Sequence, residues 1–433
     1  MTPLDRLFAL EQFGVRLGLE SIQTILLALG HPERAWPSIH IAGTNGKGSV
    51  AAMVECGLRA SGLRTGRYTS PHLDRIEERV AVDGVAVDAT TFAGVTADVL
   101  TVVDRLRADG TLTVPPTFFE VSTAVAFAIF RHAGVDVAVV EVGMGGRFDA
   151  TNVLAPVVSA ITSIALDHER HLGHTVADIA FEKAGIARRG VPLVVGRMAP
   201  AASSVVAAVA AGIGAPVMGA FDGVVVEERS ERGRFTIALR TPERTYPPMR
   251  LALLGRHQAA NAVVAARVLE TWSARAMPVT DRAIMAGLVE CEWPGRLEWI
   301  RLPGGGELLI DAAHNPAGAL ALADYLRDAG VAPLPIVVAA LQDKDLRGMV
   351  AALAPVAARF IATTVSSPRA RTAEALAGDI ATMSPGSIVD AETSADAAVA
   401  RALATAPRAV AAGSIFLIGP LRARLIAAGA ERA

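Results

Sequence analysis

The sequence predicts an α/β protein of two domains, in which parallel strands alternate with helices. The chain has 433 residues, a length that is typical of two or three domains. Short apolar runs alternate with longer segments of helical pattern, and continuous apolar runs are typical of strands that helices cover on both faces. The predicted strands are residues 38–42, 136–141, 156–161, 191–195, 308–311, 335–339, 359–362 and 409–412.

The alternation changes over residues 222–253, where short apolar runs separated by turns predict antiparallel strands. The Pro-Gly pair at residues 294–295 interrupts both helix and strand, and a new series of strands and helices follows it. We therefore predict a larger domain over residues 1–295 and a smaller one over residues 296–433.

The composition excludes several classes of protein. Lysine and arginine number 41 and aspartate and glutamate 43, and this near balance offers no general attraction for nucleic acid or an anionic membrane. The two cysteines exclude a disulfide framework. The longest uncharged stretch, residues 198–221, is interrupted by proline and glycine, and we interpret it as a helix, a turn and a short strand. The N-terminus lacks the pattern of a signal peptide, which predicts a cytoplasmic protein.

The strongest signal for function follows the first predicted strand. It is a glycine-rich loop that leads into a helix and consists of Gly43, Thr44, Asn45, Gly46, Lys47, Gly48 and Ser49. In such a loop, successive N–H groups face one anion and the lysine reaches the terminal phosphates. The spacing differs from that of the common phosphate loop. Only two residues, instead of four, lie between the first glycine and the Gly-Lys pair, and one residue separates the lysine from the hydroxyl residue that would normally follow it directly. An ordinary turn is the alternative, but we favour a phosphate loop in a P-loop ATPase-like domain.

Two further candidates lie where predicted strands end. Glu141 closes the second strand, at the edge where parallel sheets bind ligands, and an acid there is either a magnesium ligand or a solvated side chain. The nearby phosphate loop favours magnesium. His168 follows the third strand and is a candidate metal ligand that Asp167 would orient. His171 and His174 follow closely, but without cysteine or helical spacing they do not support a zinc site.

The remaining candidates each have a structural alternative. Lys183 lies in a helical pattern, where a lone lysine most often faces solvent. The structural alternative is a place on a helix surface for Asn261, an ion pair in a linker for Arg296, and a helix cap for Asp311. They gain interest because the predicted domain junction would bring them against the phosphate loop.

The ordered set of motifs resembles the Mur-ligase superfamily, and within it the folylpolyglutamate synthase/dihydrofolate synthase family. The resemblance covers nearly the whole chain and is weakest over residues 200–250 and 365–410. The motifs that carry it are residues 43–49, 70–73, 78–80, 141–152, 167–168, 182–186, 257–258 with Asn261, 294–296, Asp311 with 314–316, and 343–345.

The resemblance implies an ATP-dependent amide ligase whose second domain is Rossmann-like. A carboxylate linked to a pterin takes the γ-phosphate of ATP to form an acyl phosphate, and the amino group of L-glutamate then displaces phosphate. The implied substrates are dihydropteroate or a reduced folate, L-glutamate and ATP. Neither nucleic acid nor a membrane is an expected partner, and a monomer is the expected state.

The resemblance also implies roles for particular residues. It implies that Lys47, Lys183 and His314 are catalytic. It also implies that ATP is contacted by residues 43–49 and by Asn261, Arg296 and Asp311. One Mg²⁺ is implied at Ser70, Glu141 and His168, and a second at Lys183 in carbamylated form; a site for a monovalent cation is left open. Contacts to the pterin fall to Arg16, Leu17, Gly18, Thr117, Phe148, Asp149 and Ala150.

Several alternatives are weighed against this interpretation. In one alternative, the enzyme only extends existing folates with glutamate. In another, it is a Mur-type ligase that adds an amino acid to a different substrate. A phosphate-loop kinase or motor-type NTPase is disfavoured by the loop spacing and by the motif at residues 311–316. An inactive binding protein is disfavoured because Lys47, Glu141 and His168 are all present. A murein-precursor ligase is disfavoured because few residues precede the first predicted strand.

Overall fold

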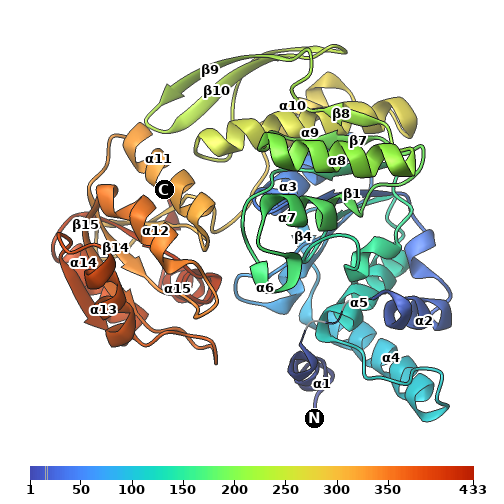
Figure 1. Cartoon of the computed structure of the whole chain (residues 1–433), viewed down its shortest axis with the longest axis horizontal. Coiled ribbons are helices and arrows are strands. Elements are labelled where there is room, and N and C mark those ends of the chain that lie inside the picture. Colours follow the sequence, from blue (N-terminus) through green and yellow to red (C-terminus); the bar gives the residue numbers. More distant parts are fainter. Residues whose placement is uncertain (15, 17) are drawn as a thin grey trace. The chain divides into compact units, whose positions relative to one another are not determined.

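The computed structural model describes residues 1–14, 16 and 18–433. The chain forms two compact units, coloured along the sequence in Figure 1. The first unit comprises Met1–Val225, Leu239–Tyr246 and Ala260–Cys291, and the second comprises Val226–Ala238, Pro247–Ala259 and Glu292–Ala433. The domain ranges 1–295 and 296–433 stay a prediction from the sequence, and each unit is described here by itself.

A mostly parallel sheet forms the centre of the first unit. Its strands are β1 (Ser38–Ala42), β2 (Thr65–Tyr68), β3 (Val80–Val82), β4 (Val85–Ala86), β5 (Val137–Glu141), β6 (Val158–Ile161), β7 (Leu193–Val195) and β8 (Val217–Gly219). They lie in the order β4-β3-β2-β5-β1-β6-β7-β8. The pairs β2–β3 and β3–β4, at one edge, are antiparallel, and the other pairs are parallel. The order places the carboxyl ends of β5, β1 and β6 side by side, and the predicted α/β class is confirmed.

The helices of the first unit connect these strands. They are α1 (Pro3–Ala9), α2 (Glu20–Ala28), α3 (Lys47–Ala60), α4 (Ala89–Ala108), α5 (Phe118–Ala133), α6 (Glu169–Leu172), α7 (Val176–Ala184), α8 (Pro200–Ile213), α10 (Asp281–Val289) and, from Ala260 onward, α9 (Arg256–Arg275). Short 3₁₀ turns include η1 (Leu10–Phe13), η2 (Pro32–Arg34), η3 (Ile76–Arg79) and η4 (Ala150–Val153). The stretch 198–221 forms α8 and β8, as the sequence predicts.

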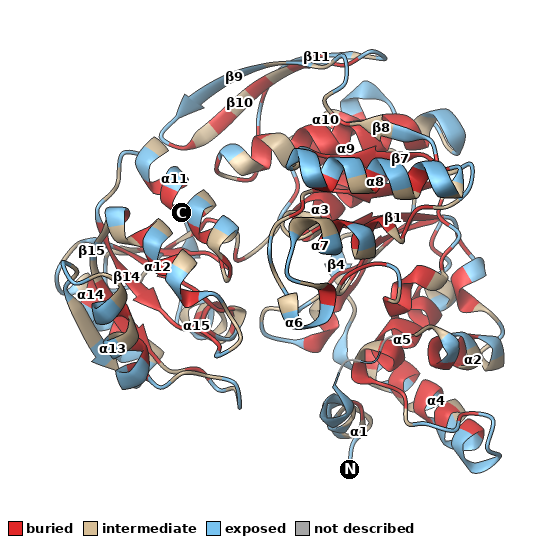
Figure 2. Ribbon diagram, viewed as in Figure 1, coloured by how far each residue is buried: buried red, intermediate tan, exposed pale blue. Residues whose placement is uncertain are grey.

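Local sequence explains where α5 begins and ends. The Thr117 side chain accepts the N–H of Glu120, and the Glu120 carboxylate accepts the N–H of Thr117, so two N–H groups of the first turn are satisfied. Gly134 ends the helix at φ 63°, a left-handed conformation that favours glycine. Most of the apolar residues between these caps are buried (Figure 2).

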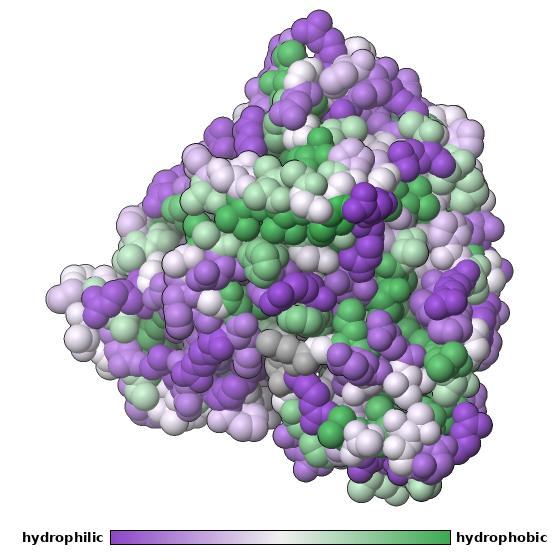
Figure 3. Space-filling view, turned by 45° about the vertical axis from the view of Figure 1, so that its right-hand side comes forward, coloured by the Kyte–Doolittle hydropathy of each residue, from purple (hydrophilic) through white to green (hydrophobic). Residues whose placement is uncertain are grey.

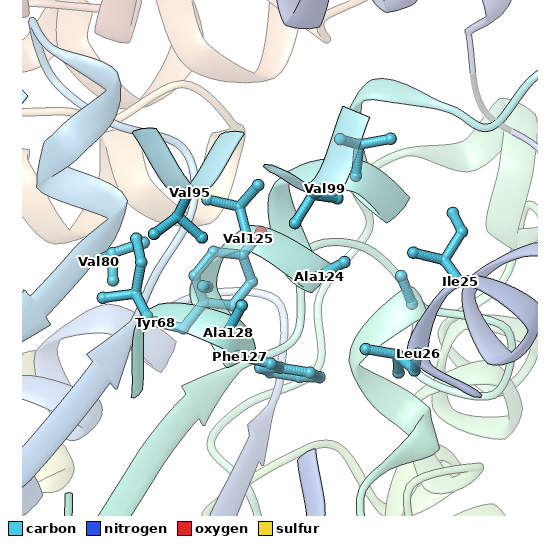
Figure 4. Packing of buried hydrophobic residues seen from close by; sticks show 14 of the residues in the cluster. Ile25, Leu26, Tyr68, Val80, Val95, Val99, Ala124, Val125, Phe127 and Ala128 are labelled. Carbon is cyan, nitrogen blue, oxygen red and sulfur yellow. The ribbon is translucent and has the colours of Figure 1, made fainter. Parts of the chain in front are cut away.

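Several large aromatic side chains of one core cluster meet between β2 and α5. Figure 4 shows Tyr68 and Phe127 in one cluster with Val80, Val95 and Leu26. The rings of Tyr68 and Phe127 lie 6.4 Å apart at 70°, and Trp36 meets Phe127 at 5.4 Å in a similar edge-to-face arrangement. Such aromatic pairs add to the stabilisation that apolar burial provides.

The second unit contains its own mixed sheet. The strands are β12 (Glu298–Arg301), β13 (Glu307–Ile310), β14 (Leu334–Val338), β15 (Ala357–Thr363), β16 (Val389–Glu392), β17 (Arg408–Ala412) and β18 (Glu431–Arg432), in the order β16-β15-β14-β17-β13-β12-β18. Strands from β16 to β13 are parallel, and β12 and β18 are antiparallel. The helices are α11 (Pro316–Asp328), α12 (Leu346–Leu353), α13 (Ala373–Met383), α14 (Ala395–Leu403) and α15 (Ile415–Ala427).

A separate three-stranded sheet consists of β9 (Val225–Glu231), β10 (Arg234–Arg240) and β11 (Thr245–Arg250). Only Arg232 and Gly233 connect β9 to β10, and both have positive φ, of 49° and 75°. Two residues of positive φ are typical of the tight turn of an antiparallel hairpin. The predicted change of pattern over residues 222–253 therefore corresponds to this sheet.

In the part of the chain that the structure describes, no helix is long and apolar enough to cross a membrane. On the face shown in Figure 3, hydrophilic residues lie among small groups of apolar ones.

Two neighbouring leucines of α2 test the packing of the core. Leu26 is 1% exposed and Leu27 is 64% exposed. We expect Leu26→Ala to lower the free energy of unfolding by about 2–5 kcal/mol, because it leaves a cavity. The matched control Leu27→Ala should change it by less than about 0.5 kcal/mol. Urea denaturation followed by circular dichroism measures both, and equal effects would contradict the described packing.

Candidate active site

The glycine-rich loop follows β1 and leads into α3. Gly43 and Gly46 have φ of 145° and 86°, where an L side chain is strained. A Cβ at Gly43 would collide with the Thr162 side chain, and one at Gly46 would lie 2.5 Å from Oδ1 of Asn261. Both glycines are therefore required by the backbone path and by the close approach of neighbouring side chains.

Residues that follow β6 hold this loop in place. The N–H of Thr44 donates to the Ser163 carbonyl at 2.7 Å, and the Thr162 hydroxyl donates to the Asn45 carbonyl at 2.7 Å. The Thr44 hydroxyl donates to the Ala165 carbonyl at 3.0 Å. Neither Thr162 nor Ser163 was predicted from the sequence to have a role. Their signal was a pair of hydroxyl residues directly after the strand that neighbours β1.

Because the loop is fixed, the N-terminus of α3 is available to an anion. Gly46 caps the helix without a side-chain hydrogen bond, and α3 continues for 14 residues. The first N–H groups of such a helix carry a partial positive charge that suits phosphate. Lys47, the first residue of the helix, donates from Nζ to the Thr44 carbonyl at 3.2 Å.

Glu141 brings a carboxylate to the same place. It ends β5 opposite Ile41 of β1, and its side chain is buried. Its Oε1 lies 3.7 Å from Nζ of Lys47, and its Oε2 accepts the N–H of Ser70 at 3.3 Å. The carboxyl ends of β1, β2 and β5 thus gather an ammonium group, a carboxylate and a serine.

Lys183 approaches the loop from α7. Its side chain is buried, and its Nζ donates to the Gly43 carbonyl at 2.7 Å. Burial, followed by the ammonium group of Lys47, lowers the pKa of Lys183 to about 7. The expectation from residue type alone, a lysine that faces solvent, is therefore wrong. The buried residues of α7 give the reason, because Ile179, Ala180, Lys183 and Ala184 share one helix face.

His168 lies at the start of α6, at a left-handed φ of 52°. Its side chain is exposed, and its N–H donates to Asp167 Oδ1 at 2.9 Å. Among the described residues, no group of three or more His, Cys, Asp and Glu side chains is arranged to hold a metal ion. The set Ser70, Glu141 and His168 contains only two such residues and a hydroxyl. Oxygen donors beside a phosphate loop fit a hard divalent cation that also binds substrate phosphates.

The residues expected on the pterin side are largely occupied in holding the backbone. Thr117 caps α5, and Arg16 donates to the Pro115 carbonyl at 3.2 Å. Asp149 accepts the N–H groups of Met144 at 2.8 Å and of Thr151 at 3.0 Å, while burial raises its pKa. The other residues of this set that the structure describes are Gly18, at φ 141°, the partly buried Phe148 and the buried Ala150. Leu17 lies outside the described residues.

In the second unit, Asp311 and His314 lie in the segment that connects β13 to α11. Asp311 accepts the N–H of Leu297 at 2.8 Å and that of Ala313 at 2.9 Å, and burial raises its pKa against the effect of Arg296. His314 contacts the Ala312 carbonyl through Nδ1 at 2.9 Å. The structure thus brings Arg296 near Asp311 within this unit. Asn261, by contrast, belongs to α9 in the first unit and lies against Gly46.

Comparison with protein families shows two matches along the chain. Residues 89–269 match the Mur ligase middle domain, and residues 295–419 match the Mur ligase glutamate ligase domain. The chain is 41% identical to a dihydrofolate synthase/folylpolyglutamate synthase of Mycobacterium tuberculosis, over 83% of this chain and 76% of that one. It is 35% identical to the Bacillus subtilis protein of the same name, over 84% and 85%.

Solved structures show the same similarity over almost the full length. Mycobacterium tuberculosis folylpolyglutamate synthase complexed with ADP superposes with a TM-score of 0.91 at 36% identity, covering 98% of both chains. Escherichia coli FolC in complex with DHPP and ADP gives 0.86 at 29% identity, covering 99% of this chain and 98% of that one. A bifunctional folylpolyglutamate synthase/dihydrofolate synthase with Mn, AMPPNP and L-glutamate bound gives 0.84 at 31% identity, covering 98% of both.

Two glycines with the same φ separate backbone strain from the role of the loop. Gly46 and Gly62 both have φ of 86°, but a Cβ at Gly62 would meet no atom within 4 Å. We expect both Gly→Ala variants to lose about 1 kcal/mol of stability. Only Gly46→Ala should also weaken ATP binding, by at least about tenfold, because Asn261 must move away from the loop. Calorimetric titration with a non-hydrolysable ATP analogue measures this, and unchanged affinity of Gly46→Ala would contradict the assignment.

Proposed function

The chain belongs to the dihydrofolate synthase/folylpolyglutamate synthase family of ATP-dependent glutamate ligases, and we propose that it joins L-glutamate to both 7,8-dihydropteroate and reduced folates. The observation that carries the proposal is the group formed by Lys47, Glu141 and Lys183 around the loop that follows β1. Relatives whose names contain both activities support the bifunctional form.

The first chemical step is proposed to occur beside Lys47. An oxygen of the substrate carboxylate attacks the γ-phosphorus of ATP, the bond from that phosphorus to the bridging oxygen breaks, and ADP leaves with the electron pair. Phosphoryl transfer of this kind requires mainly positioning and neutralisation of charge. The N–H groups of the loop 43–49 would hold the phosphates, and the ammonium group of Lys47 would neutralise the charge that develops on them.

The second step forms the amide. The neutral amino group of L-glutamate attacks the carbonyl carbon of the acyl phosphate, the bond from that carbon to the phosphate oxygen breaks, and the nitrogen loses a proton. An acyl phosphate reacts with water, so the site must exclude water until the amine arrives. We assign His314 to the glutamate side, where its imidazole would orient or deprotonate the amine.

A divalent metal suits the donors of the first unit. Manganese is bound in a solved relative, and we propose that Ser70, Glu141 and His168 hold one Mg²⁺ here. When bound, the ion would neutralise phosphate charge. Lys183 is proposed to hold a second ion after carbamylation: its neutral nitrogen bonds to the carbon of CO₂ and loses a proton, which leaves a carboxylate. Burial favours this reaction because it disfavours the ammonium form.

The remaining assignments complete the proposed substrate contacts. Asn261, Arg296 and Asp311 would contact ATP. Arg16, Gly18, Thr117 and residues 148–150 would contact the pterin through their surface and backbone, since Thr117 and Asp149 also hold local structure. The cytoplasmic location, the monomeric state and a site for a monovalent cation stay predictions from the sequence.

An assay of ADP release tests the proposed function. We expect ADP only when L-glutamate and either 7,8-dihydropteroate or tetrahydrofolate are both present, and none from the Lys47→Ala variant. ADP release without an amino acid would contradict a ligase. A Lacticaseibacillus casei relative at 37% identity is named folylpolyglutamate synthase alone, so product from tetrahydrofolate but not from dihydropteroate would assign this chain the narrower activity.

The proposed carbamate on Lys183 is tested by chemical rescue. Lys183→Ala should lower kcat by at least about 100-fold, since it removes a carboxylate that replaces solvent around the phosphates. Acetate or propionate should restore part of the activity, because the vacated space admits a short carboxylic acid. Lys183→Arg, which fills that space with a fixed cation, should be inactive and not rescued.

A direct measurement accompanies the rescue. The chain has only three lysines, Lys47, Lys183 and Lys344, so a carbamate signal from ¹³C-bicarbonate that disappears in Lys183→Ala is assigned without ambiguity. An active Lys183→Arg variant, or a carbamate signal that persists in Lys183→Ala, would refute this role.

A further inference from the structure

Arg79 is a buried cation whose contacts in the described part of the chain are uncharged. It is 8% exposed and ends η3, directly before β3. Its Nε donates to Nδ1 of His72 at 2.9 Å, and its guanidinium carbon lies 5.1 Å from the centre of the Phe118 ring. Because Nδ1 of His72 accepts this N–H, that nitrogen carries no proton, and the partner of Arg79 is an uncharged imidazole.

Another buried arginine shows what a structural role looks like in this protein. Arg267 on α9 is 3% exposed, and it forms ion pairs with Glu270, at 2.6 Å, and with Glu243. Arg79 has no such pair within 4.0 Å among the described residues. Burial lowers the pKa of Arg79 and outweighs the carboxylates of Glu11 and Glu141, which favour its charged form from beyond ion-pair distance. A buried charge without a close counter-ion is costly, which points to a counter-ion from outside the chain.

The backbone places Arg79 beside the reacting groups. Its carbonyl accepts the N–H of Thr69 at 2.9 Å, and the next residue, Ser70, donates its N–H to Glu141. Glu141 in turn lies beside Lys47. Val80, the residue after Arg79, is paired with Tyr68 of β2, and Figure 4 shows the side chains of Val80 and Tyr68 in the core. The position of Arg79 is thus fixed by the sheet.

The surroundings of Arg79 indicate which kind of anion it meets. Phe118 opens α5 next to Thr117, and its ring stacks on that of Phe8 at 5.8 Å. Aromatic rings suit the aryl part of an aromatic acid, whereas the loop at Lys47 suits phosphate. A guanidinium pairs with a carboxylate through two parallel hydrogen bonds.

We propose that Arg79 binds the carboxylate of the aromatic acid substrate and directs one of its oxygens at the γ-phosphate held by Lys47. This role rests on the proposed function, in which that carboxylate is the nucleophile. Arg79 would bind the free acid and orient it before the first chemical step. It would leave the affinity for ATP largely unchanged.

A comparison of an acid with its amide tests this role without turnover. Calorimetric titration in the presence of magnesium and a non-hydrolysable ATP analogue measures the affinity of the full-length enzyme for 7,8-dihydropteroate and for its carboxamide. We expect the wild-type protein to prefer the acid by about 10- to 100-fold, as for a charged hydrogen-bonded pair. In Arg79→Met this preference should fall to about one, through weaker binding of the acid alone.

Matched variants keep the test decisive. Arg79→Lys keeps the charge without the planar fork and should retain a reduced preference, and it replaces Arg79→Met if that variant does not fold. Arg197, another cation over a ring, lies 3.9 Å from the centre of Phe221 and is exposed; Arg197→Met should keep the full preference.

Two outcomes overturn the inference in distinguishable ways. If Arg79→Met weakens the acid and the amide equally, or weakens the ATP analogue instead, Arg79 supports the fold or the phosphates and not the carboxylate. If the wild-type protein binds neither the acid nor the amide, the proposed function itself fails.

Discussion

Three charged groups share a space with little access to water at the carboxyl ends of β1 and β5, and the first unit is arranged around them. Lys47 and Lys183 face one carboxylate, that of Glu141, and Lys183 also donates to the carbonyl of Gly43. Burial and the ammonium group of Lys47 lower the pKa of Lys183 more than the carboxylates of Asp167, Asp149 and Glu141 raise it, so the buried charge remains costly without a further counter-ion. We propose that polyphosphate supplies that counter-ion. In its absence, the lowered pKa of Lys183 relieves part of the cost.

The order of the strands, rather than the loop alone, creates this arrangement. Because β1 lies between β5 and β6, the loop after β1 has a carboxylate on one side and the hydroxyl residues Thr162 and Ser163 on the other. The hydroxyls satisfy loop carbonyls and N–H groups that would otherwise compete for the ligand. The loop therefore departs from the common phosphate-loop spacing and still keeps the start of α3 open to an anion.

The positions of the strands could be predicted because their signal is local in the sequence. The burial of single side chains could not, because it depends on which face of a helix or strand packs against the core. Each predicted strand lies within two residues of an observed one, and Glu141 stands at a strand end as expected. The edge strands β3 and β4 were not predicted, because three and two residues carry no periodicity. Residue type alone favoured a solvent-facing Lys183, and only the resemblance gave it a role, although its spacing from Ile179 and Ala180 places it on the apolar face of α7. The contact between Arg79 and His72 had no signal, since it depends on how the chain folds back after β2.

The distribution of buried cations separates what serves the fold from what serves the reaction. A buried arginine that only stabilises the fold is more favourable when carboxylates of the same chain neutralise it, as Glu243 and Glu270 neutralise Arg267. Lys47, Lys183 and Arg79 are three other buried or partly buried cations. Of these three, only Lys47 has a carboxylate of a described residue within ion-pair distance, that of Glu141. All three cations lie on segments that meet near the ends of β1, β2 and β5. The fold thus gathers buried cations with few close carboxylates in the place where we propose that anionic substrates bind. A ligand that binds only the native state stabilises it by an amount that grows with the logarithm of the ligand concentration relative to Kd. Binding of the anions would therefore offset the stability that these cations cost the free enzyme.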